Sequence, residues 1–287
     1  MQYLDLHTHT NRSDGHYDPD TLIQMAEDAR IGILAITDHN EVAFDLDVLQ
    51  ARHPNVKLLY GCEFSAAYVT ESGREVELHV VGIDFDPYHP RIRALLAQNK
   101  IDRKPYIDSM LAALAKWDIF IGTYEELCEK YPETKHLGRK ALGTEMAKQG
   151  YVKDVDEAFD LYLGAFGERR AYVKNPARYA DLAICVEAIL AAGGTAILAH
   201  LPYFQLTEQE ALALLAEFRS LTGSVGAMEV YYSKYTEEEQ QELLALSRQF
   251  GLLPSAGSDF HGQCERETLE YHYPAELYTA MVEARQR

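Results

Sequence analysis

The stretch Tyr3-Leu4-Asp5-Leu6-His7-Thr8-His9 places two histidines at the end of a short apolar run. Side chains alternate along a β-strand, so His7 and His9 face the same side and can reach one ion. The same order returns at 33–37, which precedes Asp38-His39, and at 195–199, which precedes His200. We therefore predict a barrel-like sheet that carries metal chemistry at one rim.

Nine imidazole and carboxylate residues lie in or just beyond such apolar runs: His7, His9, Asp14, His39, Glu63, His79, His200, Asp259 and His261. A lone His-x-His motif is also typical of structural histidines, but the recurrence of Asp-His at 38–39 and Asp-x-His at 259–261 favours a metal site. Imidazole and carboxylate without thiolate suit zinc, manganese or iron bound for catalysis. Nine ligands are too many for one ion, so we expect two or three ions that share a carboxylate.

The overall charge limits the class of partner. The chain has 287 residues, with 45 acidic and 27 basic side chains and a formal net charge of -18. A long nucleic acid held by a basic surface is therefore not expected. A small anionic substrate remains compatible, because bound divalent cations reverse the local field.

The cysteines and the apolar runs indicate the compartment. No Cys-x-x-Cys pair occurs among Cys62, Cys128, Cys185 and Cys264, which argues against a cysteine-based zinc site. No apolar run approaches the roughly 20 residues that cross a bilayer, and the N-terminus lacks the features of a signal peptide. We expect a cytoplasmic protein with free thiols and no membrane partner, and the sequence leaves its oligomeric state open.

Short strands alternate with helices in both terminal parts of the chain. We predict strands at 3–7, 32–37, 56–61, 64–71, 75–85, 195–199, 226–231 and 253–256. A turn at Glu71-Ser72-Gly73 is expected to join the strands at 64–71 and 75–85. The helices between them are expected near 19–30, 41–52, 179–192, 207–222 and 236–250. This order favours parallel strands with crossover helices, which close into a (β/α) barrel with functional residues at the C-terminal ends of its strands.

The middle of the chain follows a different pattern. Periodic Leu, Ala and Tyr predict helices at 90–117, 123–131, 138–150 and 154–163, and none of the nine candidate ligands falls there. We predict a discontinuous barrel domain over 1–95 and 172–287, and a helical insertion, or lid, over 96–171. The alternative is a set of ordinary barrel helices with long loops.

The candidate ligands belong to short motifs: His7-Thr8-His9 with Asp14, Thr37-Asp38-His39, Glu63, His79, Ala199-His200 and Gly257-Ser258-Asp259-Phe260-His261. In combination these motifs resemble the polymerase and histidinol phosphatase (PHP) superfamily, over roughly residues 1–90 and 175–265. The resemblance implies an α/β fold with a distorted (β/α)7 barrel, a trinuclear metal site and a helical insertion similar to the lid of bacterial PHP phosphoesterases.

The resemblance also implies a role for each position. A first ion would be held by His7, His9, Glu63 and Asp259, a second by the bridging Glu63 with His79 and His200, and a third by Asp14, His39 and His261. The family often has His where this chain has Asp14, and a carboxylate there shifts the preference toward harder ions. We therefore expect Mn²⁺, with Fe²⁺ or Zn²⁺ as alternatives. Asp38 would either orient a ligand imidazole or cap the following helix. Glu229 is a candidate support of the cluster, and Tyr231 or Tyr232, at the same strand end, is a candidate to line the pocket.

The lid supplies the candidate substrate contacts. Arg139 is expected to bind phosphate through paired hydrogen bonds, the alternative being a solvated arginine at a helix start. His16, close to Asp14, and Arg170, near the return to the barrel, are further candidates, although an exposed position suits Arg170 equally. Thr144 stands where the resemblance leads us to expect a second basic residue. A solvated helix face is expected for Lys100, Arg103 and Lys104.

Taken with these residues, the resemblance implies a metal-dependent phosphoesterase. We expect it to hydrolyse a phosphomonoester of a small nucleotide or metabolite, such as a nucleoside 3',5'-bisphosphate or a nucleoside monophosphate, by metal-activated water. No protein nucleophile is required, and the predicted catalytic residues are Glu63, Asp259, Arg139 and Asp38. The alternatives are a 5'-3' exoribonuclease on short 5'-phosphorylated RNA, a histidinol phosphatase and a non-catalytic metal-binding regulatory module.

Overall fold

The computed structural model describes residues 3–100, 103–132, 137–164, 167–171, 179–262 and 267–287. The strands are β1 (Tyr3–Thr8), β2 (Ile31–Ile36), β3 (Lys57–Val69), β4 (Glu75–Ile83), β5 (Thr195–Leu198), β6 (Ala227–Tyr232), β7 (Leu253–Gly257) and β8 (Tyr273–Pro274). The helices are α1 (Pro19–Asp28), α2 (Leu46–Arg52), α3 (Pro90–Gln98), α4 (Arg103–Ala115), α5 (Tyr124–Lys130), α6 (Arg139–Lys148), α7 (Val155–Ala158), α8 (Leu182–Ala191), α9 (Glu208–Thr222), α10 (Glu237–Phe250) and α11 (Glu276–Arg285). None of the described helices is long and apolar enough to cross a membrane.

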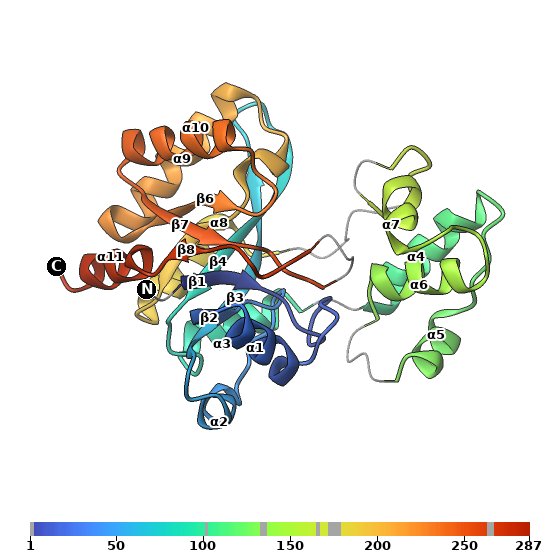
Figure 1. Ribbon diagram of the computed structural model, residues 1–287. Coiled ribbons are helices and arrows are strands. Elements are labelled where there is room, and N and C mark those ends of the chain that lie inside the picture. The colour runs from blue at the N-terminus through green and yellow to red at the C-terminus, as the bar shows by residue number, and fades with distance from the viewer. Residues whose placement is uncertain (1–2, 101–102, 133–136, 165–166, 172–178, 263–266) are drawn as a thin grey trace.

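All the strands form one sheet that curls into a nearly closed barrel (Figure 1). Its order is β7-β6-β5-β4-β3-β2-β1-β8. The segment after β7 returns to β1, where the Asp259 N–H donates to the His7 carbonyl at 2.8 Å and the His9 N–H donates to the Phe260 carbonyl at 2.9 Å. The predicted class, an α/β fold with a distorted barrel, is therefore confirmed. The sheet has eight strands where the resemblance implied a seven-stranded barrel, because it includes the two-residue β8.

Three strand pairs correct the expectation of a parallel barrel. β4 runs antiparallel to both β3 and β5, and β8 runs antiparallel to β1. The pairs β1–β2, β2–β3, β5–β6 and β6–β7 are parallel. The loop 70–74 joins β3 to β4 as a tight turn, in which the Thr70 N–H donates to the Arg74 carbonyl at 2.9 Å. Such a turn can join only antiparallel neighbours, because a parallel pair needs a crossover connection of a dozen or more residues.

The secondary structure also differs from the prediction in three respects. β3 is one strand of 13 residues where two were expected, so Glu63 lies within it and not after it. The helix expected over 90–117 is divided into α3 and α4, because Asn99 ends α3 and turns its side chain toward β3. The short β8 and the helix α11 were not predicted, and a two-residue strand carries no periodic signal.

Alternating side chains of the strands build two apolar layers. In β2, Ile33 and Ala35 belong to the cluster inside the barrel, while Leu34 and Ile36 pack outward with α1 and α2. Helix α11 contributes Met281 to the inner cluster. The inner layer therefore fills the barrel as a packed core, which supports the strand ends that carry the candidate ligands.

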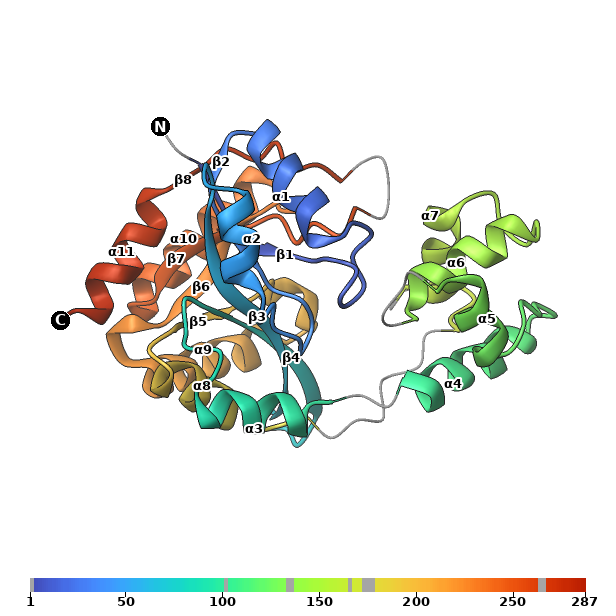
Figure 2. The same ribbon diagram turned by 90° about the horizontal axis from the view of Figure 1, so that it is seen from below.

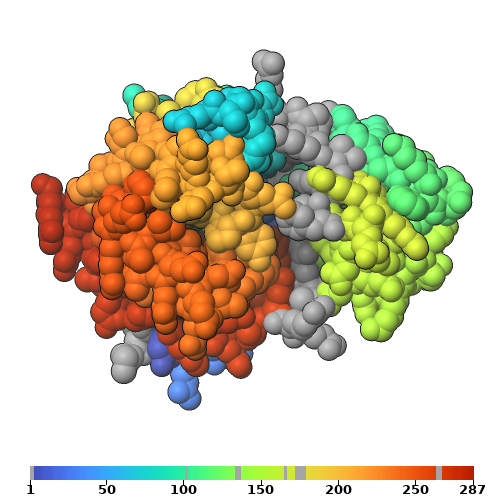
Figure 3. Space-filling model, turned by 90° about the horizontal axis from the view of Figure 1, so that it is seen from above, coloured from blue at the N-terminus to red at the C-terminus, as the bar shows by residue number. Residues whose placement is uncertain are grey.

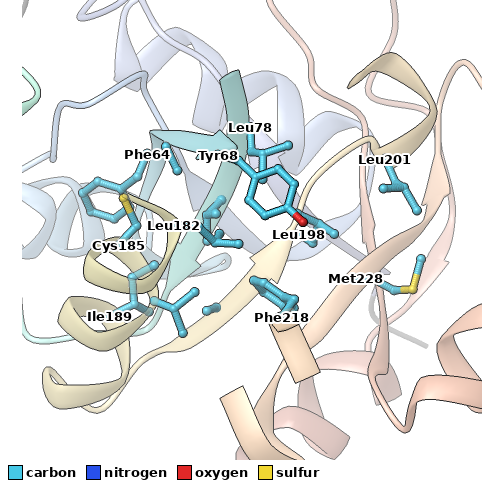
Figure 4. Packing of buried hydrophobic residues seen from close by; sticks show 14 of the residues in the cluster. Phe64, Tyr68, Leu78, Leu182, Cys185, Ile189, Leu198, Leu201, Phe218 and Met228 are labelled. Carbon is cyan, nitrogen blue, oxygen red and sulfur yellow. The ribbon is translucent and has the colours of Figure 1, made fainter. Parts of the chain in front are cut away.

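A larger cluster covers the outer face of β3, β4 and β5. Figure 4 shows Phe64 and Leu78 of the sheet near Ile189 of α8 and Phe218 of α9, and all four are fully buried. Full burial of one such side chain contributes about 1.5–3 kcal/mol. This layer therefore anchors the long strand that carries Glu63.

Helices α4 to α7 form a lobe beside the barrel, on the side away from α11 (Figures 1 and 2). They share an apolar cluster of their own, which includes the fully buried Leu114, Leu127, Leu142 and Leu163. The space-filling view shows this lobe standing next to the body formed by the strands and the remaining helices (Figure 3). The boundaries of the barrel domain and the insertion given above stay a prediction.

Candidate metal centre

The candidate ligands gather at one end of the barrel because most of them follow or end parallel strands. His7 lies in β1, His200 follows β5, and Asp259 follows β7. β4 runs the other way, so His79 comes from its middle, opposite Ser65 of β3. A cavity of about 460 Å³ is lined by Asp14, His39, Glu63, His79, His200, Asp259 and His261. His7 and His9 lie buried next to Glu63, so the structure brings all nine predicted ligands together.

The backbone at two of these positions adopts a conformation that L-residues seldom use. The φ angle is 25° at His200 and 54° at Asp259, both in the left-handed region. Gly257 allows the second turn, since a Cβ at this position would lie 2.3 Å from the Cβ of His7. Strained backbone of this kind clusters at functional sites, where the surrounding structure holds it in place.

The buried carboxylate of Glu63 is the centre of the group. Its two oxygens lie between 2.7 and 3.3 Å from one nitrogen each of His7, His9, His39, His79 and His200. The shortest of these contacts, 2.7 Å, joins Oε1 to Nδ1 of His79. A carboxylate with imidazoles around both oxygens has the geometry of a ligand that bridges two ions.

Three sets of donor atoms each lie within 4.8 Å of one another: His7, His9, Glu63 and Asp259; His9, Asp14, His39 and His261; and His39, Glu63 and His79. The first set has the four members that the resemblance implied. The second adds His9 to the expected residues, and the third has His39 where His200 was expected. The Nε2 atom of His200 nevertheless lies 3.0 Å from Oε1 of Glu63 and 3.3 Å from Nδ1 of His79.

Electrostatic interactions keep the buried carboxylates ionised. Burial alone would raise the pKa of Glu63, but the charges of His79 and His39 hold that pKa well below its usual range. Burial would also raise the pKa of Asp259, but the charge of His261 lowers it, and the resulting pKa lies well below the usual range. Burial lowers the pKa of His79, the Glu63 carboxylate raises it, and the resulting pKa is about 10. Protonated imidazoles thus balance the carboxylates, and a divalent ion would supply the same positive charge while releasing these protons.

Buried donor atoms without a well-oriented hydrogen bond test whether such ions fit. Among the described residues these atoms are His7 Nε2, His9 Nδ1 and Nε2, Glu63 Oε2 and His200 Nδ1. Some of them face each other at a short distance, such as the 3.3 Å between His9 Nε2 and Glu63 Oε2. Buried polar atoms of this kind are rare in folded proteins and indicate a bound ion or an ordered water. The donors are nitrogen and oxygen without sulfur, which suits manganese, iron and zinc. The residues therefore fit a cluster of divalent ions.

Glu229 of β6 positions two candidate ligands through hydrogen-bonding contacts. Its Oε1 lies 2.9 Å from Nδ1 of His7, and its Oε2 accepts the His200 N–H at 2.8 Å. This carboxylate is buried. The sequence offered Glu229 as a candidate support of the cluster, and its spacing alone could not show that role; the signal was a carboxylate in an otherwise apolar strand, Ala-Met-Glu-Val-Tyr-Tyr.

Asp259 is held by hydrogen bonds that the sequence did not indicate. The Tyr232 hydroxyl donates to Oδ2 of Asp259 at 2.8 Å. Oδ1 faces Nε2 of His9 at 3.1 Å and Nε2 of His7 at 3.4 Å. Asp5 in β1 accepts the Ser258 N–H at 3.0 Å and so ties the start of this turn to the first strand. These contacts join residues more than 200 positions apart or on neighbouring strands, so no local motif reports them.

Asp38 stabilises the loop that contains Asp14 by accepting hydrogen bonds from it. Its carboxylate accepts the Thr10 N–H at 2.8 Å and the hydroxyls of Thr10 and Ser13 at 2.6 Å each. No imidazole in the described part of the chain hydrogen-bonds to it, and the next helix, α2, begins only at Leu46. Asp38 therefore has neither of the two contacts expected for it, an oriented imidazole or a capped helix.

The predicted substrate contacts lie in different places. Arg139 begins α6 and lines the central cavity, with its guanidinium 5.6 Å from the centre of the Phe159 ring. His16 lines a neighbouring cavity of about 180 Å³ together with Asp14. Arg170 is exposed and lines none of the three cavities beside the centre.

Two further residues of the central cavity were not assigned to the site from the sequence. Lys234 follows β6, and its Nζ lies 4.0 Å from Oδ2 of Asp259. Tyr203 lies in the 3-10 turn after His200. Both follow strands whose C-terminal ends meet at the site, and this position is the one signal that could have identified them.

Comparisons with known proteins agree with this geometry. The family described as PHP domain matches residues 5–277. A 5'-3' exoribonuclease of Haemophilus influenzae is 31% identical over 264 residues, which covers 91% of this chain and 90% of the relative. A 3',5'-nucleoside bisphosphate phosphatase of Chromobacterium violaceum is 27% identical over 266 residues, with coverage of 92% and 89%. The solved structure of an amidohydrolase from Chromobacterium violaceum, with bound sulfate and no metal, has a TM-score of 0.79 and 26% identity, and the match covers 97% of this chain and 96% of that one.

Proposed function

Because the chain belongs to the PHP domain family, as its motifs led us to expect, we propose that it hydrolyses a phosphomonoester of a small nucleotide or related metabolite with bound divalent ions. One observation carries this proposal. Nine imidazole and carboxylate residues converge around one cavity, which Arg139 of the inserted helices also lines. The related nucleoside bisphosphate phosphatase and the sulfate in a related structure support a phosphate-like ligand.

We infer that two to three ions bind, with Mn²⁺ preferred and Fe²⁺ or Zn²⁺ as alternatives. One ion would be held by His7, His9, Glu63 and Asp259, another by Asp14, His39 and His261, and a third by Glu63, His79 and His200. When bound, the ions would stabilise the phosphate oxygens as Lewis acids and make water nucleophilic near neutral pH. The buried nitrogen and oxygen atoms around Glu63 that form no well-oriented hydrogen bond with a described residue support this assignment.

The side chains of the protein would orient the substrate and the ligands. The Arg139 guanidinium would grip the phosphoryl oxygens through paired N–H donors, which a lysine could not match in geometry. Glu229 would hold His7, and Tyr232 would hold Asp259, so that the donor atoms are placed before substrate binds.

The test measures products from a panel of substrates: phosphate from adenosine 3',5'-bisphosphate, adenosine 5'-monophosphate and histidinol phosphate, and both phosphate and nucleoside monophosphate from a 5'-phosphorylated dinucleotide. Metal-stripped protein should be inactive and should recover with Mn²⁺. Glu63→Ala and the near-isosteric Glu63→Gln should both lose activity while circular dichroism shows a folded chain. Glu75→Ala, at an exposed position of the adjacent strand, is the control. Full activity in metal-stripped protein would refute the mechanism.

A 5'-3' exoribonuclease acting on short 5'-phosphorylated RNA is the second candidate. The relative with that name is 31% identical to this chain, whereas the bisphosphate phosphatase is 27% identical. The net charge of -18 favours short chains, because the binding of long RNA depends on many basic contacts. The ratio of kcat/KM for the 5'-phosphorylated dinucleotide to that for the bisphosphate separates the two candidates.

We also propose that the enzyme works in the cytoplasm. Cys62, Cys128 and Cys185 are free thiols, and two of them are buried. Free thiols are typical of a reducing compartment. Cell fractionation followed by immunodetection would test the proposal, and recovery with an extracytoplasmic fraction would overturn it.

A further inference from the structure

We propose that the exposed rings of Trp117, Phe120 and Tyr151, together with the Arg169 guanidinium, form a stacking platform for single-stranded RNA on the inserted helices. The inference goes beyond hydrolysis at the metal centre. It rests on the second candidate function, because only an RNA substrate continues as a chain past the phosphate that the ions would bind. None of these four residues lines the cavities beside the metal centre, so the platform is a separate surface.

Three large aromatic side chains are exposed in two neighbouring segments of the insert. Their exposed fractions are 48% for Trp117, 64% for Phe120 and 38% for Tyr151. Ile119 and Ile121 are buried in the apolar cluster of the insert, so Phe120 between them points outward. The Phe120 N–H donates to the Tyr151 hydroxyl, and that hydroxyl donates to the Phe120 carbonyl, at 3.4 Å each. Single exposed apolar residues are ordinary, but a group of large rings marks a binding surface.

Arg169 joins this surface to the rim of the metal centre. Its guanidinium carbon lies 5.9 Å from the centre of the Trp117 ring, and its Nη1 donates to the Tyr162 hydroxyl at 2.9 Å. Tyr162 belongs to a π-helical turn, Phe159–Leu163, and Phe159 at the start of that turn lines the central cavity. A guanidinium beside an aromatic ring stacks on nucleobases and pairs with phosphate, so Arg169 suits both parts of a nucleotide.

The charge of the chain is distributed unevenly. The insert predicted over 96–171 holds 12 of the 27 basic and 13 of the 45 acidic residues, so its formal charge is -1 and that of the remainder is -17. The segments of the platform, 116–120, 148–153 and 168–170, contain five basic and two acidic residues, and Arg170, which the sequence offered as a substrate contact, is one of the five. A polyanion is repelled by a surface of like charge. An RNA chain that leaves the metal centre therefore meets less repulsion along the insert than along the barrel.

The inserted helices set the distance between the metal centre and the platform. Arg103, the first residue of α4, lines a cavity together with His39 and His79. From there α4 leads away from the barrel (Figure 2), and its 13 residues span about 20 Å at about 1.5 Å per residue. Trp117 follows shortly after the end of this helix. Nucleotides several positions downstream of the 5' phosphate would therefore reach the rings, whereas both nucleotides of a dinucleotide stay near the metal centre.

RNA fits this surface better than a protein partner does. Proteins that bind single strands combine aromatic rings, on which bases stack, with basic groups along the backbone. Trp, Tyr and Arg also anchor protein interfaces, but lysine is depleted there. Lys116 and Lys153 are both exposed beside the rings in the sequence, which favours the nucleic acid.

The test uses the full-length protein in EDTA, so that binding is measured without hydrolysis. Trp117 is the single tryptophan of the chain, and a base stacked on its ring should quench its fluorescence. The ligands are a 5'-phosphorylated hexaadenylate, the matching dinucleotide and an abasic hexamer of the same charge. We expect the hexaadenylate to quench the fluorescence and to bind about 10-fold more tightly than the dinucleotide, since each stacked base adds affinity. The abasic hexamer should bind weakly and leave the fluorescence unchanged.

Variants locate the effect, with affinity measured by the fluorescence anisotropy of RNA labelled at its 3' end. Trp117→Ala and Phe120→Ala should each weaken hexaadenylate binding about 10-fold, and Trp117→Phe should recover most of the loss. Binding of the dinucleotide should not change in any of them. Tyr88→Ala is the matched control, because Tyr88 is 58% exposed and lies 5.6 Å from the Phe44 ring, but outside the insert.

Unquenched Trp117 fluorescence with the hexaadenylate, or equal hexaadenylate affinities for wild type, Trp117→Ala and Phe120→Ala, would overturn the proposal. So would self-association in analytical ultracentrifugation that Phe120→Ala abolishes, since a second copy of the chain would then cover the rings. The proposed function is judged separately. A Mn²⁺-loaded protein that binds the hexaadenylate through these rings but releases no nucleoside monophosphate from it would exclude the exoribonuclease candidate and leave the platform in place.

Discussion

The Nδ1 atom of His7 and the Oε1 atom of Glu229 lie 2.9 Å apart, and both residues are buried beside the metal centre. A carboxylate in this position holds the proton on Nδ1, which leaves the lone pair of Nε2 directed at the opposite side of the ring. On that side, Nε2 lies 3.3 Å from Glu63 and 3.4 Å from Asp259. The same carboxylate accepts the N–H of His200, so Glu229 positions two candidate ligands at once.

Replacement of Glu229 by Gln should therefore weaken metal binding more than folding. Glutamine keeps an acceptor for the His200 N–H but loses the charge that fixes the His7 tautomer. Loss of such a supporting carboxylate typically costs about 10–100-fold in metal affinity. Competition of Mn²⁺ between the protein and a chelator measures the change. Glu242→Gln, at an exposed position of α10, should bind like wild type, and equal affinities for the two variants would contradict the assigned role of Glu229.

A smaller effect is expected at Tyr232, whose hydroxyl donates to Oδ2 of Asp259 at 2.8 Å. Tyr232→Phe removes one hydrogen bond to a buried carboxylate and should lower the free energy of unfolding by about 1–3 kcal/mol. It should also weaken Mn²⁺ binding, because Asp259 gains freedom to rotate. Urea denaturation and the chelator competition measure the two changes. Tyr231→Phe, the neighbour on the other face of β6, is the control and should change neither quantity, since no described residue hydrogen-bonds to its hydroxyl.

The ligand motifs could be identified from the sequence because each lies close to a strand. His7 and His9 share a face through the two-residue period of β1, and Asp259 and His261 repeat that spacing after β7. The structure then brings these motifs together, as parallel strand ends must be in a barrel. Local spacing was enough here because the backbone geometry of a strand is the same in every protein.

Other parts of the site depend on tertiary contacts that no local pattern carries. Glu229 reaches His7 across 222 positions of the chain. Arg103 lines a cavity only because α3 ends at Asn99 and α4 then starts in a new direction, whereas the periodicity predicted one continuous helix. The turn between β3 and β4 was predicted from Glu71-Ser72-Gly73 and is confirmed, and it accounts for the reversed direction of β4. The antiparallel pairing of β4 with β5 involves distant segments and carried no local signal.

Asn99 joins the chain leading to the inserted helices to the strand of Glu63. Its side chain is fully buried and donates to the Ser65 carbonyl at 2.7 Å and to Oδ1 of Asn40 at 2.8 Å. It also accepts the N–H of Ala180, on the chain that returns from the insert, at 2.9 Å. Asn40 directly follows His39, so this network links both connections of the insert to the metal centre.

Asn99→Ala should therefore lower both stability and substrate affinity. The change leaves the Ser65 carbonyl and the Ala180 N–H without these partners in a buried place, which should cost about 2–3 kcal/mol in the free energy of unfolding. A looser insert should raise KM for substrates that contact Arg139 more than it lowers kcat. Urea denaturation and steady-state kinetics measure the two effects. Gln98→Ala changes the exposed residue one position earlier, and a Gln98→Ala variant as impaired as Asn99→Ala would remove the basis for this link.

The insert contains a pH-dependent contact of its own at Glu145. The Glu145 carboxylate accepts hydrogen bonds from Lys130 Nζ at 2.5 Å, Gln149 Nε2 at 2.7 Å and the Tyr131 hydroxyl at 3.0 Å. Burial alone would raise the pKa of Glu145, but these three donors lower it to about 2, from an ordinary value of 4.5. A lowered pKa means that the contact stabilises the fold fully above about pH 4.5 and that this contribution is lost as the pH falls toward 2.

Glu145→Gln should accordingly destabilise the insert at pH 7 and somewhat less at pH 3.5, because the folded-state pKa of about 2 keeps much of the contact ionised there. We expect a difference of about 1–2 kcal/mol at pH 7, a modest value because Lys130 is half-exposed and solvent screens its charge. Trp117, the single tryptophan, follows α4 and reports unfolding of this part of the chain through its fluorescence in urea. Glu129→Gln changes an exposed carboxylate one residue before Lys130 and should follow wild type at both pH values. A Glu145→Gln difference that stayed constant between pH 7 and pH 3.5 would show that packing, and not the ionised carboxylate, accounts for the stabilisation.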